Sequence, residues 1–271
     1  MAAEKSQNPV FRFADRLGRN TVTFVEEVGN CGWLIVECVF WLVRGPGLKQ
    51  PVRLVAIVEQ MMEIGVRAIF IVGLLAGTIG IMLAIQGIYT LGIFGAEDRV
   101  VFGIAFSVTR EFAPLITGII VAGRSGAALA ARIGTMKISE EIDALHVMGI
   151  NPTRYLVVPA MVAMIVMLPT LTIFANLMGI WAAGVFVNLE LGISMAAYLS
   201  DTMDILSVDD IGHGIGKSLI FAVLIAVIGV VNGAAVTGGA EGVGKATTRA
   251  VVQAIIAIVV TDMIFAFIAT R

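Results

Sequence analysis

Long stretches without any charged residue constrain this chain more than any other feature of its sequence. Residues 68–96, 155–189 and 218–240 contain no Asp, Glu, Lys or Arg. Each exceeds the roughly 20 residues that an α-helix needs to cross a bilayer. Charged residues make up only 14% of the chain, whereas a soluble domain carries about 25%. The sequence therefore predicts an integral membrane protein.

Two further segments reach the same length once a few internal charges are allowed. Residues 100–123 contain Arg110 and Glu111, and residues 250–269 contain Asp262. Spanning strands of a barrel are short and alternate in polarity, which these long apolar segments do not. We therefore expect an all-α integral membrane protein. Its five transmembrane helices are predicted at residues 68–94, 100–123, 156–185, 214–237 and 250–269.

Residues 1–65 precede the first span and are expected to form an N-terminal cytoplasmic or interfacial helical segment, with residues 66–271 as the membrane domain. Within the first segment, Cys31–Val43 is apolar but short, and it ends at Arg44. Such a stretch is typical of an interfacial or partly re-entrant helix, and a sixth full span is the alternative. The polar N-terminus shows no cleavable secretory signal.

Basic residues gather on one side of the predicted topology. With the N-terminus inside, most of the 18 Lys and Arg residues fall on the cytoplasmic side, as the positive-inside rule requires. The opposite loops are acidic, for example at Glu97, Asp98 and Asp201. We therefore expect a cytoplasmic N-terminus and a C-terminus on the outer side.

Glycines recur at close intervals in the first span, at Gly73, Gly77 and Gly80. Small residues at this spacing let two helix backbones approach closely in lipid. The pattern favours packing within the chain, and a dimer interface is the alternative.

Arg110 and Glu111 lie well inside the second span. Charges at that depth are expensive, so they normally face a cavity or a protein partner. Adjacent helical residues point about 100° apart, so these two cannot neutralise each other side by side. Pro114 allows a kink just beyond them. Two interpretations remain open: contact with a polar headgroup or a gate, and an interhelical ion pair such as Arg110 with Asp262.

Other polar residues in the spans have simpler expected roles. Lys217 and Asp262 favour interhelical partners over substrate contact, and Asn176 and Asn232 favour interhelical hydrogen bonds. Between the third and fourth spans, residues 194–206 are expected to form a short surface helix.

The cytoplasmic stretch between the second and third spans predicts a short, well-capped helix at about residues 139–149. Ser139 is a good N-cap, Glu140 and Glu141 favour the positive end of the helix, and Gly149 ends it. The helix is too short to cross a membrane. Its apolar side is formed by Ile142, Leu145 and Met148. This design favours a docking helix for a cytoplasmic partner over a solvated loop.

The stretch GGAEGVGKATT, residues 238–248, comes within one residue of a phosphate-binding loop. Ala246 stands where the magnesium-binding hydroxyl should be, and an apolar span rather than a strand precedes the stretch. We therefore expect ATP to bind elsewhere. The stretch is expected to be the cytoplasmic turn between the fourth and fifth spans, with Thr247 or Thr248 capping the fifth.

The segment REFAPLITGIIVAGRSGAALAARIGTMKISEEIDALHVMGINPTRYLVVPA, residues 110–160, resembles the signature region of the MlaE/YrbE permeases. These proteins are the membrane subunits of MCE-type ABC lipid transporters. The likeness runs almost without gaps from about Gly73 to the C-terminus, and it is weakest over residues 1–50.

The resemblance implies an architecture like that of the ABCG exporters. Residues 66–271 would be the permease domain, and each copy in a homodimer would have five spans, an N-terminal interfacial helix and a short cytoplasmic coupling helix. The implied partners are a second copy of the chain, a cytoplasmic ABC ATPase dimer, a STAS-domain protein, a periplasmic MCE-domain hexamer and phospholipid. ATP and Mg²⁺ would lie on the ATPase, with no cofactor bound by this chain and no nucleic acid among its partners.

Two groups of residues acquire roles from the resemblance. The ATPase would grip the coupling helix through Glu140, Glu141, Asp143, Ala144, Leu145 and Met148. The lipid cavity between the two copies would be lined by Leu83, Gln86, Thr90, Leu91, Phe94, Arg110 and Glu111.

The resemblance implies a permease that moves phospholipid between the bacterial inner membrane and a periplasmic MCE protein, in support of outer-membrane lipid asymmetry. Hydrolysis of ATP would occur on another subunit, so we expect no catalytic residue and no metal ligand here. The alternative is an ion-coupled secondary carrier for a hydrophobic or amphipathic substrate, with Arg110, Glu111 and Asp262 as its relay. Five spans without an evident inverted repeat disfavour that alternative.

Overall fold

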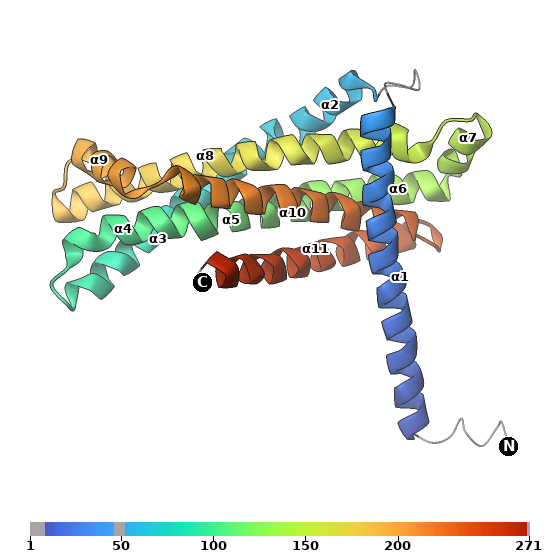
Figure 1. Ribbon diagram of the computed structural model, residues 1–271, viewed down its shortest axis with the longest axis horizontal. Coiled ribbons are helices and arrows are strands. Elements are labelled where there is room, and N and C mark those ends of the chain that lie inside the picture. The colour runs from blue at the N-terminus through green and yellow to red at the C-terminus, as the bar shows by residue number, and fades with distance from the viewer. Residues whose placement is uncertain (1–8, 46–51, 270–271) are drawn as a thin grey trace. The chain divides into compact units, whose positions relative to one another are not determined.

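The computed structural model describes residues 9–45 and 52–269 of the chain, which divides into two units, residues 1–51 and 52–271. In the first unit, α1 is one continuous helix of 36 residues, Pro9–Arg44 (Figure 1). A re-entrant segment would need a reversal within Cys31–Val43, and the helix has none. The stretches long and apolar enough to cross a membrane do not include α1, so the sixth span is not supported.

The second unit begins at residue 52, and its helix α2 packs against α8 among the membrane helices. In chain order its α-helices are α2 (Leu54–Ile64), α3 (Ile69–Gly92), α4 (Val100–Phe106), α5 (Ala113–Val121), α6 (Ala127–Ile138), α7 (Glu141–Val147), α8 (Val158–Leu191), α9 (Met195–Ile205), α10 (Val208–Ala234) and α11 (Gly239–Ala269). Short 3₁₀ turns precede α3 and α4.

In the described residues, the π-helical turns Ser107–Phe112 and Ala122–Gly126 join α4 to α5 and α5 to α6, and a third, Thr153–Val157, leads directly into α8. Because of this continuity, the described residues contain five helical stretches that could cross a membrane. They are Leu54–Gly92, Glu97–Ile138, Thr153–Leu191, Val208–Ala234 and Gly239–Ile268. The prediction of an all-α membrane protein with five spans is confirmed. The helices run further into polar sequence than the apolar runs alone indicated.

Within the second unit the long helices lie side by side (Figure 1). α10 is central and contacts α6, α8 and α11, and α3 packs along α8. The short helices sit at opposite ends of these long ones, with α7 at one end and α9 at the other (Figure 1). The predicted surface helix is therefore α9, and the side chain of Ser194 caps it by accepting from the Ala197 amide.

Glycines explain how closely α3 and α8 pack. A Cβ on Gly80 would collide with the backbone of Gly179, and a Cβ on Gly73 would press on the ring of Phe174. Gly77 faces Ala182 with less constraint, because a Cβ there would make only an ordinary contact at 3.5 Å. Gly73, Gly77 and Gly80 therefore all face α8, which confirms packing within the chain.

The predicted N-cap of the short cytoplasmic helix was wrong. Ser139 ends α6 instead of capping α7, and the residue before α7 is Glu140, with a left-handed φ of 58°. That conformation turns the chain sharply between the end of α6 at Ile138 and the start of α7 at Glu141. Gly149 does end the segment, at a φ of 72°.

The phosphate-loop-like stretch is mostly helix and not a turn. α11 starts at Gly239, and the positive φ values of Gly238 and Gly239 make the reversal after α10. Thr247 and Thr248 therefore lie inside α11, where their hydroxyls donate to carbonyls four residues back. Lys245 pairs with Glu241 on the helix surface at 2.7 Å.

Candidate functional site

Five charged side chains meet among the second, fourth and fifth spans: Arg110, Glu111, Asp210, Lys217 and Asp262. We call this group the central charge cluster. Its innermost member is Lys217, whose side chain is fully buried. The Lys217 Nζ lies 2.6 Å from Glu111 Oε2 and 2.9 Å from Asp262 Oδ1. One ammonium group therefore links three helical stretches through two carboxylates.

The other pair of the cluster lies at the start of α10. Arg110 Nε donates to Asp210 Oδ1 at 2.6 Å, and its Nη2 contacts the same oxygen. Asp210 is itself fixed by a capping box, because Oδ2 accepts from the backbone amide of Ser207 at 2.9 Å. The Arg110 guanidinium also lies over the ring of Phe106, 5.0 Å from its centroid.

The geometry of the two helices explains this pairing. Arg110 and Glu111 are adjacent and point apart, so they reach different partners. Their partners Asp210 and Lys217 are seven residues apart on α10, which places them on one face two turns from each other. The π turn Ser107–Phe112 carries both of the first two residues, and such turns are frequent at functional sites.

Arg110 does form an interhelical ion pair, as one interpretation predicted, but the predicted partner Asp262 is wrong. Arg110 takes Asp210 and Asp262 takes Lys217. The expectation that Lys217 and Asp262 are satisfied interhelical partners is confirmed. So is the one for Asn232, whose amide donates to Gln253 Oε1 at 2.7 Å.

The cluster is buried on one side and open on the other. The Arg110 and Glu111 side chains remain 39% and 38% exposed, whereas those of Asp210 and Asp262 are mostly buried. A buried charge that loses its partner is costly, so the inner groups hold the outer ones in place. The Arg110 guanidinium and the Glu111 carboxylate are therefore the parts of the cluster that a ligand or a neighbouring molecule can contact.

His213 is a member of this neighbourhood that sequence reasoning missed. It lies between Asp210 and Lys217 on α10, with its ring edge-on to Phe265 at 5.6 Å. Its Nε2 is buried and has no hydrogen-bond partner among residues 9–45 and 52–269. The spacing of three and four residues from the two charges was the signal that could have found it.

Four of the predicted cavity residues lie together in one groove. Leu83, Gln86, Thr90 and Leu91 line a space of about 280 Å³ between α3 and α4. Gly103, Ile104 and Ser107 form the other wall, and Ser107 begins the turn that carries Arg110. Phe94 lies beyond this groove and is highly exposed, and neither Arg110 nor Glu111 lines it.

A second and larger cavity was not predicted. It measures about 750 Å³, has an almost wholly apolar lining, and lies among α8, α9 and α10. Thr109 Oγ1 and Asn176 Oδ1 belong to residues that line it, and both atoms are buried without a partner in the described part of the chain. Next to it, burial raises the pKa of the Tyr198 hydroxyl to about 12, so that group stays protonated at physiological pH.

The predicted coupling residues gather on α7 and the residues around it. Glu140, Glu141, Asp143, Ala144 and Met148 are exposed, and Asp143 lies 3.9 Å from Lys137. Leu145 is different, because it is only 8% exposed and packs within the chain. The most exposed apolar residue here is Val147, at 89%, which the sequence analysis did not select.

Comparisons with known proteins agree on one family. The family described as Permease MlaE matches residues 57–268. A probable ABC transporter permease of Rickettsia typhi is 32% identical over 232 residues, covering 86% of this chain and 88% of the relative. A similar protein of Synechocystis is 36% identical over 184 residues, covering 68% and 70% of the two chains.

A third relative has a more specific name. The intermembrane phospholipid transport system permease protein MlaE of Haemophilus influenzae is 31% identical over 226 residues, covering 83% of this chain and 84% of the relative. In ABC transporters of this kind the permease is not the catalytic subunit. The chain therefore belongs to the MlaE family of ABC transporter permeases.

Proposed function

We propose that this permease moves phospholipid between the inner membrane and a periplasmic MCE-domain protein, driven by a separate ATPase dimer. The observation that carries the proposal is the half-open central charge cluster next to the apolar groove between α3 and α4. A phospholipid needs an apolar lining for its chains and a few polar groups for its headgroup. The name of the Haemophilus relative supports the same substrate.

The proposed transport path lies between two copies of the chain. α3 leaves a row of large apolar side chains uncovered, including Phe70, Leu74 and Ile85, which fits a face turned toward lipid or a second copy. In this arrangement the open edges of Arg110 and Glu111 face the headgroup. We place the N-terminus in the cytoplasm and the C-terminus in the periplasm, because of the distribution of basic residues.

The proposed ATPase contact is the surface around α7. Its position at the end of the long helices opposite α9 suits a cytoplasmic partner if α9 is periplasmic (Figure 1). A STAS-domain protein bound to the ATPases and an MCE-domain hexamer on the periplasmic side complete the proposed assembly. ATP and Mg²⁺ would be held by the ATPase subunits.

Glu111→Gln tests the transport site in a reconstituted complex. Lys217 keeps Asp262 as a partner in this variant, so we expect normal assembly and a loss of ATP-dependent lipid transfer of about tenfold or more. Glu190→Gln, an exposed acid at the end of α8, is the matched control. Normal transfer by the Glu111 variant would remove the cluster from the lipid path.

The same assay separates the ion-coupled alternative. An ABC permease keeps transferring lipid when an ionophore collapses the proton gradient, provided that ATP is present. A secondary carrier shows the opposite dependence.

Val147→Arg tests the docking surface. Because Val147 is exposed, the charge should leave the fold intact and reduce co-purification of the ATPase by about tenfold. Leu145 is a poor probe of docking, since its burial means that a charge there disturbs α7 itself. Full recovery of the ATPase with the Val147 variant would place the contact elsewhere.

A further inference from the structure

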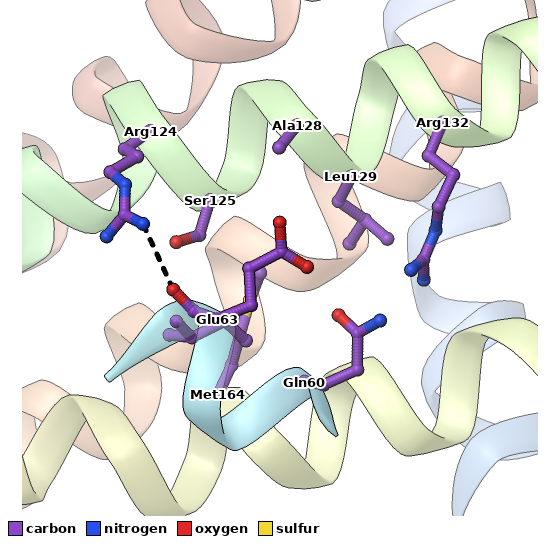
Figure 2. Close-up of a pocket in the computed structure, with 9 residues that line it drawn as sticks. Gln60, Glu63, Arg124, Ser125, Ala128, Leu129, Arg132 and Met164 are labelled. Atoms are coloured by element: carbon purple, nitrogen blue, oxygen red, sulfur yellow. Dashed lines mark hydrogen bonds between the residues drawn. The ribbon is translucent and has the colours of Figure 1, made fainter. Parts of the chain in front are cut away.

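Two arginines of the second helical stretch converge on a small pocket beside α2, further toward the C-terminal end of that stretch than the central charge cluster. Figure 2 shows Arg124, Ser125 and Arg132 on one wall and Gln60 and Glu63 on the other. The pocket has a volume of about 90 Å³, which is room for several water molecules or one tetrahedral anion. We call it the arginine pocket.

Each guanidinium in the arginine pocket is held on one side and unsatisfied on another. Arg124 Nη2 donates to the carbonyl oxygen of Glu63 at 3.2 Å. With the Gln60 amide oxygen turned toward Arg132, that oxygen accepts from Nη1 and Nη2 at 2.5 and 3.1 Å. The remaining atoms Arg124 Nη1 and Arg132 Nε are buried and have no partner in the described ranges 9–45 and 52–269.

The charge balance of the arginine pocket favours an anion. Glu63 is the acid in its lining, and its carboxylate lies 3.9 Å from Arg67, outside the lining. The lining therefore carries two positive charges against one negative charge, along with the hydroxyl of Ser125. Guanidinium groups bind phosphate with paired, charge-assisted hydrogen bonds. An unsatisfied buried donor costs free energy, which such a ligand would recover.

The depth of the pocket points to the source of the phosphate. Arg124 lies about 36 Å along its helix from Val100, just beyond a hydrocarbon core of about 30 Å. Arg132 lies further out, but side chains on a helix tilt toward its N-terminus, and here that direction leads back toward the membrane. Both guanidinium groups therefore reach the level of the lipid headgroups.

α2 supports a lipid as the occupant. Its outer side exposes Leu54, Val55 and Val58, while Gln60 and Glu63 face the pocket (Figure 2). Exposed apolar side chains at this end of a membrane-crossing stretch lie against the acyl chains of neighbouring lipids. Basic pockets between helices at this level bind the headgroups of anionic lipids.

We infer that the arginine pocket binds the phosphate group of an anionic lipid, at a site separate from the proposed transport groove. Arg124 and Arg132 hold the phosphate oxygens, and Ser125 donates from the wall between them. The lipid so bound anchors α2 to the second span. This site exists whether or not the chain transports phospholipid, so it can be tested on the permease alone.

The test measures lipid binding by native mass spectrometry on the full chain purified in mild detergent. The probe is dioleoylphosphatidylglycerol, and dioleoylglycerol is the comparison that lacks a phosphate. We expect the double variant Arg124→Gln, Arg132→Gln to bind the phosphatidylglycerol at this site about tenfold more weakly or worse. The control Lys137→Gln removes a positive charge from the same helix outside the pocket and should change the affinity less than about twofold.

Glu63→Gln gives an independent arm with the opposite sign. It removes a negative charge from the pocket lining, so affinity should rise several-fold, which a purely structural role of the arginines does not predict. This arm keeps the proposal testable if the double arginine variant fails to fold.

Inorganic phosphate distinguishes the two sources of the same chemistry. If inorganic phosphate binds at the pocket while the affinity for phosphatidylglycerol is the same with and without the two arginines, the site takes free phosphate. The lipid assignment is then wrong. If dioleoylglycerol binds as tightly as the phospholipid, or if both arginine and Glu63 variants leave binding unchanged, the pocket is only a clamp between α2 and α6 and the inference fails.

Discussion

One helical stretch, Glu97–Ile138, carries two groups of charge that are built in opposite ways. At its first π turn, Arg110 and Glu111 find counter-charges on α10, and Lys217 finds a second one on α11. At and beyond its second π turn, Arg124 and Arg132 bond to neutral oxygens and keep donors without a partner in the described part of the chain. Each charge of the central charge cluster therefore has a counter-charge within the described chain, whereas the hydrogen bonds of the pocket arginines go to uncharged oxygens.

This difference separates two uses of charge in a membrane. Far from water, every charge needs a partner from the protein, because the lipid offers none. At headgroup level the lipid supplies charges of its own, so an arginine can be left for a ligand. The comparison predicts that the cluster governs stability and the pocket governs association.

The largest expected effect is that of Lys217→Met. Removing the fully buried ammonium leaves Glu111 and Asp262 facing each other without a counter-charge, and loss of one partner from a buried group costs about 3–5 kcal/mol. Thermal unfolding in detergent measures it. Lys245→Met is the matched control, because its pair with Glu241 is exposed and contributes about 0–1 kcal/mol. Equal stability of the two variants would contradict the comparison.

A smaller effect is expected for Asp210→Asn. Arg110 loses its charged partner, but its side chain is 39% exposed and can turn outward, so we expect a loss of about 1–3 kcal/mol. The control is Asp209→Asn, an exposed neighbour in the first turn of α10 that contributes through the helix dipole alone. The comparison is weakened if both variants unfold at the same temperature.

The smallest effect concerns salt. Raising the salt concentration from about 0.05 to about 0.5 M screens the electrostatic attraction between solvent-accessible charges. The affinity of the arginine pocket for phosphatidylglycerol should therefore fall several-fold. The unfolding temperature set by the buried cluster should barely move over the same range. A strong salt dependence of unfolding in the wild-type chain, absent from Lys217→Met, would reverse the roles assigned to the two regions.

The architecture was largely predictable, since apolar length alone locates the five spans. The close packing at Gly73, Gly77 and Gly80 and the surface helix at residues 194–206 were also predictable, because each follows from a local rule about spacing or residue type. The reversal at Glu140 was not, because a left-handed acidic residue carries no signal in the sequence.

The ion-pair partners in the central charge cluster could not be predicted from the sequence, for a different reason. Sequence places Arg110, Asp210 and Asp262 in the right elements, but the choice between the two aspartates depends on how α10 and α11 are rotated. It also depends on the direction of Arg110, which the π turn at Ser107–Phe112 changes at a point that no residue type marks. Val147 was missed likewise, because which side of α7 packs on α6 follows from the turn at Glu140.

The contact between Gly80 and Gly179 has a mechanical consequence. With no side chain between their backbones, α3 and α8 interlock and cannot slide past each other, so we expect them to move as one rigid body. Any widening of the groove between α3 and α4 must then come from α4 moving away from α3. The π turn Ser107–Phe112, at the C-terminal end of α4, would be the hinge. Arg110 and Glu111 lie on that hinge, so each widening of the groove would strain their ion pairs with Asp210 and Lys217 on α10.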